Sequence, residues 1–204
     1  MVVAIIGIMI AIAVPLVGGY PESRQLSAEA DNIESQIAYA RLVAVSSGKP
    51  VELRFYLAPV VETRSMGSDE YYRSSQVLIR DEQGRYRPDG RAQKFGGKTI
   101  VLDDPTYSSI MASEPQPPDP NATAVQNRAV ARRSYQAIRF LPDGSTNLGR
   151  GGDEYWTLTL VNWDPSLSSS GSAPRLGPGE KFPNFVTIQI DPFTAKIRRY
   201  EPGR

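Results

Sequence analysis

The sequence contains no cysteine and no histidine among its 204 residues. Without cysteine the chain has no disulfide bridge, no thiol nucleophile and no thiolate ligand for a metal. Without histidine it has no Ser-His-Asp triad and no imidazole ligand for zinc. These absences remove most of the common enzyme chemistries. We expect the chain to hold no cofactor and no metal ion.

A strong charge of either sign is also missing. The chain has 23 Lys and Arg against 22 Asp and Glu, which leaves a formal net charge of +1. Such a balanced chain has no overall field for nucleic acid or for an acidic substrate, so any binding of that kind has to come from a local patch.

Two pairs of adjacent carboxylates, Asp103-Asp104 and Asp153-Glu154, are the remaining candidates for acid/base or calcium chemistry. Neither pair has the spacing of an oxygen-ligand loop, and adjacent side chains on an extended chain point to opposite faces. We expect both pairs to lie in solvated turns. A membrane-tethered hydrolase that uses Asp153 and Glu154 is the weaker alternative.

Charge is absent altogether from the first twenty residues, and residues 1–17 form an almost unbroken aliphatic run. A twenty-residue helix spans about 30 Å, roughly the hydrocarbon thickness of a bilayer. Three interpretations compete: a cleaved secretory signal, a buried core helix and a retained membrane helix. No basic residue precedes the run, as a signal peptide requires, and a helix that is apolar on every face needs a large protein around it. We therefore expect residues 1–20 to form a retained membrane helix.

Residues 21–48 are expected to form an amphipathic half of the same helix. Between residues 26 and 45, apolar side chains recur every three or four positions, which is typical of a helix with one buried face. These side chains are Leu26, Ala30, Ile33, Ile37, Ala40 and Ala44. Gly48 suits the left-handed residue that ends a helix, and Pro50 prevents continuation. Pro15 and Gly18-Gly19 predict a kink between the two halves, and the alternative is two helices with a linker.

Residues 49–204 predict a β-rich head, because apolar and polar residues alternate there with the period of two that is typical of half-buried strands. Strands are expected at 51–57, 76–80, 99–102, 134–141, 155–161, 185–190 and 195–200. The last two are expected to form a hairpin about a turn at 191–194, with Val186, Ile188 and Ile190 on one face. Segments 113–127 and 164–183 are rich in Pro, Ser or Gly and are expected to be surface loops. The predicted fold class is α+β, with a long N-terminal helix followed by an antiparallel sheet.

Basic side chains gather at two places in the head. One group contains Arg132 and Arg133, and the other contains Lys196, Arg198 and Arg199. On a terminal strand Lys196 and Arg198 share one face and Arg199 takes the other, which is typical of a solvated edge that resists aggregation. The alternative hypothesis is a surface that captures DNA or another polymer through these side chains.

The order of a hydrophobic helix, an amphipathic helix and then an antiparallel sheet, with Ala4-Ile5-Ile6-Gly7-Ile8 and Pro15 at their observed spacing, resembles type IV pilins and the pseudopilins of type II secretion. The remainder is similar to minor pseudopilins of the H type. Three segments resemble the Verru_Chthon cassette protein D group of prepilin-like proteins. They are residues 51–56, residues 139–146 and residues 186–192.

The resemblance implies a single-pass, non-enzymatic subunit of the bacterial inner membrane whose head faces the periplasm. Its apolar half would then pack against the same segment of other pilin-like subunits in a pilus or pseudopilus. The implied contact surface for lipid and for other subunits consists of Val2, Val3, Ala4, Ile5, Ile6, Gly7, Ile8, Ile10, Ile12 and Val14, followed by Pro15. Gly7 would permit close helix approach.

The sequence departs from the family at its start. Family members begin with a basic leader that ends in Gly and is cut by a prepilin peptidase before a Phe, and a Glu follows within a few residues. None of these precedes Val2. We expect either a true start upstream of Met1, with the peptidase as a partner, or a chain that is not processed. A missing Glu would weaken docking, because in the family that carboxylate is thought to pair with a neighbouring subunit's terminal amine.

Overall fold

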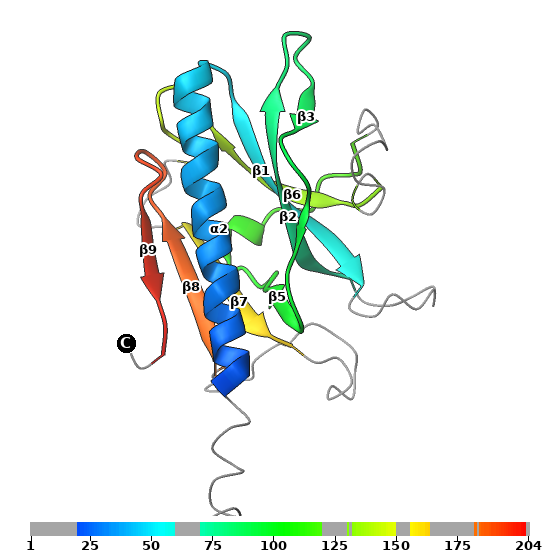
Figure 1. The fold of residues 1–204 in the computed structure, drawn as a ribbon, viewed down its shortest axis with the longest axis vertical. Coiled ribbons are helices and arrows are strands. Elements are labelled where there is room, and N and C mark those ends of the chain that lie inside the picture. The colour runs from blue at the N-terminus through cyan, green and yellow to red at the C-terminus, as the bar shows by residue number, and fades with distance from the viewer. Residues whose placement is uncertain are drawn as a thin grey trace, which may run out of the picture.

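The computed structural model describes residues 20–59, 70–119, 130, 132–149, 156–163, 182 and 184–202. In this part of the chain one long helix, α2 (Tyr20–Ser47), lies across a nine-stranded antiparallel sheet (Figure 1). The predicted α+β arrangement, with the helix ahead of the sheet, is confirmed. Residues 1–19, which make up nearly all of the predicted membrane helix, lie outside the described residues. So do the larger parts of the predicted loops 113–127 and 164–183.

The α2 helix follows from the spacing of its apolar residues. Leu26, Ala30, Ile33, Ile37, Ala40 and Ala44 are each at most 2% exposed and pack against the sheet. The helix ends where the sequence predicts, because Gly48 has a φ of +65°, which glycine adopts without strain. With 28 residues, α2 is about 42 Å long. Within the described part of the chain, no helix has a stretch that is long and apolar enough to cross a membrane.

The sheet combines pairings between consecutive strands with pairings between strands that are far apart in the sequence. Its strands are β1 (Val51–Pro59), β2 (Glu70–Arg80), β3 (Tyr86–Pro88), β4 (Gln93–Lys94), β5 (Thr99–Val101), β6 (Tyr135–Phe140), β7 (Trp156–Asn162), β8 (Phe185–Ile190) and β9 (Ile197–Tyr200). Their order is β6-β1-β2-β5-β7-β8-β9, and β3 and β4 pair with β2 beside this path. The long strand β2 therefore has β1 along one edge and β3, β4 and β5 in turn along the other.

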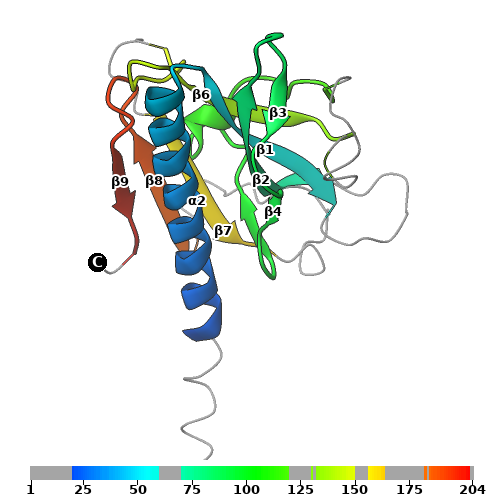
Figure 2. The ribbon, with the colours of Figure 1, turned by 45° about the horizontal axis from the view of Figure 1, so that its top comes forward.

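The two ends of this strand order approach each other near the C-terminal end of α2. After β6 the chain turns back so that Thr146 bridges to Phe140, and the Thr146 amide donates to the carbonyl oxygen of Pro192 at 2.8 Å. Pro192 lies in the turn between β8 and β9, and Figure 2 shows this turn and the turn after β6 on the same side of the helix. The short 3-10 helix η1 (Ser109–Met111) borders β7, because Ser109 Oγ accepts the Thr157 amide at 2.9 Å.

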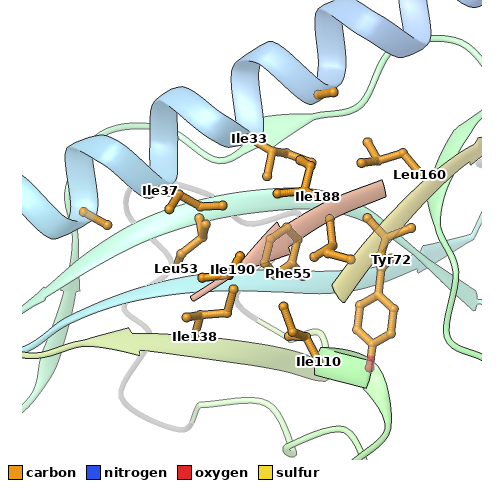
Figure 3. Packing of buried hydrophobic residues seen from close by; sticks show 14 of the residues in the cluster. Ile33, Ile37, Leu53, Phe55, Tyr72, Ile110, Ile138, Leu160, Ile188 and Ile190 are labelled. Carbon is orange, nitrogen blue, oxygen red and sulfur yellow. The ribbon is translucent and has the colours of Figure 1, made fainter. Parts of the chain in front are cut away.

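The core lies between α2 and the concave face of the sheet. In Figure 3, Ile33 and Ile37 of the helix point toward side chains of several strands, and the labelled strand residues include Leu53, Phe55 and Ile188. All five of these side chains are fully buried. The alternate residues of β1 point to the outer face of the sheet. They include Glu52 and Arg54, whose charged side chains are buried.

The strand predictions at 51–57 and 185–190 are confirmed, and Val186, Ile188 and Ile190 share the buried face as expected. The prediction at 76–80 was too short, because β2 begins at Glu70. The Arg and Ser residues in the first half of β2 interrupt the alternation of apolar and polar residues. The short strands β3 and β4 were not predicted. β9 begins at Ile197 rather than at residue 195, because Ala195 has a φ of +50° and completes the preceding turn.

Candidate functional site

The second half of α2 carries apolar side chains on part of its exposed side as well as on its buried side. Tyr39, Leu42 and Val45 are 46%, 65% and 51% exposed, and Ala38 beside them is also exposed. Between Ser35 and Gly48, Arg41 is the one charged residue. We call Ala38, Tyr39, Leu42 and Val45 the exposed stripe of α2. A contiguous apolar patch that is exposed on a helix is a candidate contact surface.

The exposed stripe runs across the solvent side of the helix between two loops. At one border the Tyr39 hydroxyl donates to Asp89, which follows β3, over 2.5 Å, and this hydrogen bond raises the pKa of Tyr39. At the other border, a Cβ atom at Gly144 in the turn after β6 would lie 3.6 Å from Cγ2 of Val45. The Tyr39–Asp89 hydrogen bond thus ties one border of the stripe to the head, and the turn after β6 lies close to the other border.

Arg199 joins the terminal strand to α2. Its guanidinium pairs with Asp31 on the helix and with Glu201, lies 3.8 Å from the Glu34 carboxylate, and donates to the Ser27 carbonyl oxygen at 3.4 Å. Burial by itself lowers the pKa of Arg199, but its hydrogen bonds to the carboxylates of Asp31 and Glu201, together with their negative charge, outweigh that effect and raise it. Desolvation raises the pKa of Glu34. This cluster attaches the C-terminal edge of the sheet to the first half of the helix.

A second ionic cluster lies on the outer face of the sheet. Glu52 and Arg54 on β1 are each 3% exposed, and Arg54 Nε donates to Glu52 at 2.9 Å. Arg139 on β6 donates to the other oxygen of Glu52 at 2.8 Å, and Asp119 accepts from Arg54 Nη1 at 3.1 Å. We call Glu52, Arg54, Asp119 and Arg139 the outer-face cluster.

Tyrosine rings enclose the outer-face cluster. The Arg54 guanidinium lies 4.2 Å from the centre of the Tyr135 ring and 5.4 Å from that of Tyr86. Burial alone lowers the pKa of Arg54, but Glu52 more than offsets this and raises it. Burial also raises the pKa of Tyr56, next to Arg54 on the same face, to about 12. Two guanidinium groups and two carboxylates leave the cluster formally neutral, so it offers no surplus charge to a ligand.

The residues predicted as polymer-binding do not form one surface. Arg133 pairs with Glu70 at 2.7 Å and Arg199 belongs to the helix cluster, whereas Arg132, Lys196 and Arg198 are exposed. Arg132 and Arg133 precede the start of β6. Lys196 follows the turn between β8 and β9, which contacts the chain just after the end of β6. The six residues of β6 span about 17 Å and separate the two groups.

Of the remaining sequence candidates, Asp103 and Asp104 lie within the described residues. Asp104 Oδ1 accepts the Thr106 amide at 2.8 Å, as in the predicted turn. Among the described residues, no group of three or more acidic side chains could hold a metal ion. Asp153, Glu154 and the predicted contact residues from Val2 to Pro15 lie outside the described residues. The exposed stripe was missed, although the near absence of charge from residues 35–48 was visible in the sequence.

No protein-family model matches the chain, and no curated protein matches it at a significant level. Among solved structures, the chain is similar to the minor pseudopilin EpsH from the Type 2 Secretion System of Vibrio cholerae, with 8% sequence identity and a TM-score of 0.45. The match covers 88% of this chain and 99% of that chain. A likeness of this size does not establish the function of the chain.

Proposed function

We propose that this chain is a non-enzymatic, pilin-like structural subunit that assembles with other subunits through its N-terminal region. The observation that carries the proposal is the exposed stripe of α2, with Leu42 at its centre 65% exposed. Exposure of apolar side chains to water costs free energy, which is recovered when another surface covers them. A subunit that packs its helix against neighbours supplies that cover.

The sequence ahead of α2 supports the same role. The aliphatic run of residues 1–17 leads into α2 with only Gly18 and Gly19 between them, so the N-terminal region carries an apolar segment at its start and the exposed stripe near its end. The run is long enough to span a bilayer as a helix. In our proposal it anchors the subunit in the inner membrane before assembly and then contacts other subunits, through residues such as Ile5, Gly7 and Ile8.

In its finer detail the proposal follows the sequence resemblance. It assigns the chain to the subunits of a type IV pilus or type II secretion-like fibre, of the H-type minor pseudopilin kind and near the Verru_Chthon cassette protein D group. The head then faces the periplasm or the exterior. A prepilin peptidase is a partner if the natural chain extends upstream of Met1.

Cysteine cross-linking tests the assembly role directly, because the natural chain contains no cysteine. The full-length Leu42→Cys variant in membranes should give a disulfide-linked dimer on oxidation, since the stripe meets a neighbouring subunit. The matched control is Arg198→Cys, which is also exposed but lies on β9. Equal cross-linking of both variants, or of neither, would contradict the proposal.

Charge at the same position gives a second test. Leu42→Glu should abolish higher-order assemblies in membrane extracts, whereas Ala28→Glu, at an exposed position nearer the start of α2, should leave them intact. Thermal unfolding should be unchanged for both variants, because neither side chain belongs to the core. If the Leu42→Glu variant assembles normally, the stripe is not part of the interface between subunits.

A further inference from the structure

Basic side chains gather on the hairpin of β2 and β3 and on the segment that follows it. Residues 80–98 contain six Lys and Arg against three Asp and Glu, although the whole chain has a formal net charge of only +1. The rest of the chain therefore carries a small negative charge. Four of the six basic residues are exposed arginines: Arg80, Arg85, Arg87 and Arg91. We call these four residues the hairpin arginines.

The turn of this hairpin projects beyond the neighbouring strands, at the end of the molecule where α2 ends (Figure 1). Lys49, two residues past α2, lies 3.9 Å from Glu82 in the turn. The Asp81 amide donates to the Arg85 carbonyl oxygen at 2.8 Å, and the Gly84 amide donates to the Asp81 carbonyl oxygen at 3.0 Å. Backbone hydrogen bonds thus fix the turn that joins the two strands and orders the arginines on either side of it.

Arginines lie on both faces of the hairpin. Arg80 is opposite Tyr86 in the register of β2 and β3, so these two side chains share one face. Arg87 is opposite Ile79, and the alternation of a strand places it on the other face. A flat anionic surface would contact the cations of one face only. Two rows of negative charge with a gap between them would contact the cations of both faces.

One carboxylate pairs with two of the hairpin arginines. Asp81 Oδ2 accepts from Arg87 Nε at 2.7 Å and lies 3.5 Å from Arg85 Nε, yet the two arginine side chains are still 64% and 50% exposed. Arg80 donates to a backbone carbonyl oxygen at 3.2 Å. Within the described part of the chain, neither Arg80 nor Arg91 pairs with a carboxylate. Asp81 therefore neutralises one of the four charges, and the other three are available to a partner.

The chemistry of the hairpin favours a duplex phosphate backbone. The planar fork of a guanidinium group matches the oxygens of a phosphate. The major groove of DNA is about 12 Å wide, admits a two-stranded β-ribbon and is bordered by a phosphate strand on each side. The major groove of duplex RNA is too narrow, and single strands bind largely by stacking on aromatic rings. The ring of Tyr86 in the hairpin already lies against the guanidinium groups of Arg54 and Arg139, at 5.4 and 5.6 Å.

We propose that the hairpin of β2 and β3 binds duplex DNA by placing its turn in the major groove, with the hairpin arginines on the phosphates of both strands. The binding is independent of base sequence, because phosphate contacts carry no sequence information. The proposal goes beyond the assembly role and does not rest on it, since none of the hairpin arginines belongs to the exposed stripe of α2. It adds a nucleic-acid partner to a protein that is otherwise structural.

The test is the fluorescence anisotropy of a labelled DNA duplex of about 20 base pairs, which is two helical turns, titrated with the full-length chain in an uncharged detergent. We expect a Kd of about 10 μM at about 50 mM salt and about 60-fold weaker binding at about 200 mM, because some three phosphate contacts release counterions. Single-stranded DNA and duplex RNA of the same length should bind at least about threefold more weakly. No saturable binding of the DNA duplex at the lower salt concentration, or equal binding of all three probes, would overturn the proposal.

Variants then locate the site. Arg87→Ala and Arg91→Ala should each weaken binding about fivefold and reduce the salt slope by about 1. Glu82→Gln should tighten binding about threefold, because it removes a negative charge from the turn, and a merely structural role would not produce that gain. Arg198→Ala, at an exposed position on β9, is the control and should bind as the natural chain does.

Arg91→Ala decides the outcome if Arg87→Ala lowers the thermal midpoint, since Arg91 makes no hydrogen bond to a described residue. Unchanged binding by Arg91→Ala, or an equal loss of binding in Arg198→Ala, would place any DNA contact elsewhere and refute the assignment. Binding by Glu82→Gln that is no tighter than that of the natural chain would likewise contradict a phosphate contact at the turn.

Discussion

The guanidinium of Arg54 lies 4.2 Å from the centre of the Tyr135 ring, across the boundary between β1 and β6 on the outer face of the sheet. Both side chains are buried, at 3% and 7% exposure. Glu52 and Asp119 occupy the other sides of the same guanidinium at 2.9 and 3.1 Å. Arg54 thus connects β1 and β6 with the segment that contains Asp119.

Replacing Arg54 by alanine should destabilise the head by about 3 kcal/mol, because Asp119 and Glu52 then lose a buried cationic partner. Chemical denaturation checks this value. The control is Arg85→Ala, whose side chain is 50% exposed in its ion pair with Asp81, and it should cost less than about 0.5 kcal/mol. Equal effects of the two substitutions would show that burial of the Arg54 pair is unimportant.

Arg199→Ala should loosen β9 from α2 and cost about 1–2 kcal/mol, because three acidic groups near it lose their partner. Hydrogen exchange should speed up at the amides of β9 and leave β1 unaffected. Arg198→Ala, one residue earlier on the same strand, is exposed and serves as the control. Faster exchange in both variants would mean that the strand edge, and not the Arg199 cluster, sets the protection.

Stability should fall between pH 10 and about 12. Burial raises the pKa of both Tyr56 and Tyr72 from 10.0 to about 12, so the folded chain keeps protons that the unfolded chain releases in this window. The stabilising contribution is complete below pH 10 and is lost as the pH rises through 12, at up to about 2 kcal/mol for each tyrosine.

Denaturant midpoints at pH 8 and near pH 11.5 measure this loss. Tyr56→Phe should reduce the difference between the two midpoints, whereas Tyr200→Phe, at an exposed position, should leave it unchanged. A midpoint that stays constant up to pH 12 in the natural chain would contradict burial of the two phenols.

Gly48→Ala should destabilise α2 by about 1 kcal/mol. Nothing lies within 4 Å of a Cβ atom built at this position, so the cost comes from the φ of +65° alone. Gly149→Ala is the control, because its φ is not positive and its Cβ would lie in ordinary contact with Trp156 at 3.9 Å. A change in thermal midpoint for Gly149→Ala but not for Gly48→Ala would contradict the helix-end geometry.

Local patterns in the sequence predicted the elements whose own residues determine their conformation. The three- and four-residue spacing from Leu26 to Ala44 predicted the helix and its buried face, and Gly48 predicted its end. Alternation predicted β1 and β8. These predictions succeed because the spacing of apolar residues depends on the geometry of the helix or strand itself, whichever segments form the rest of the core.

The tertiary structure decided what depends on residues far apart in the chain. Glu52 and Arg54 read as exposed strand positions, yet they are buried because β6 and Asp119 cover them. Gln36 and Gln93 meet only because the β2–β4 hairpins fold back onto α2. Alternation along one strand specifies which side chains share a face but not which segment covers that face, and long-range pairing alone supplies that information.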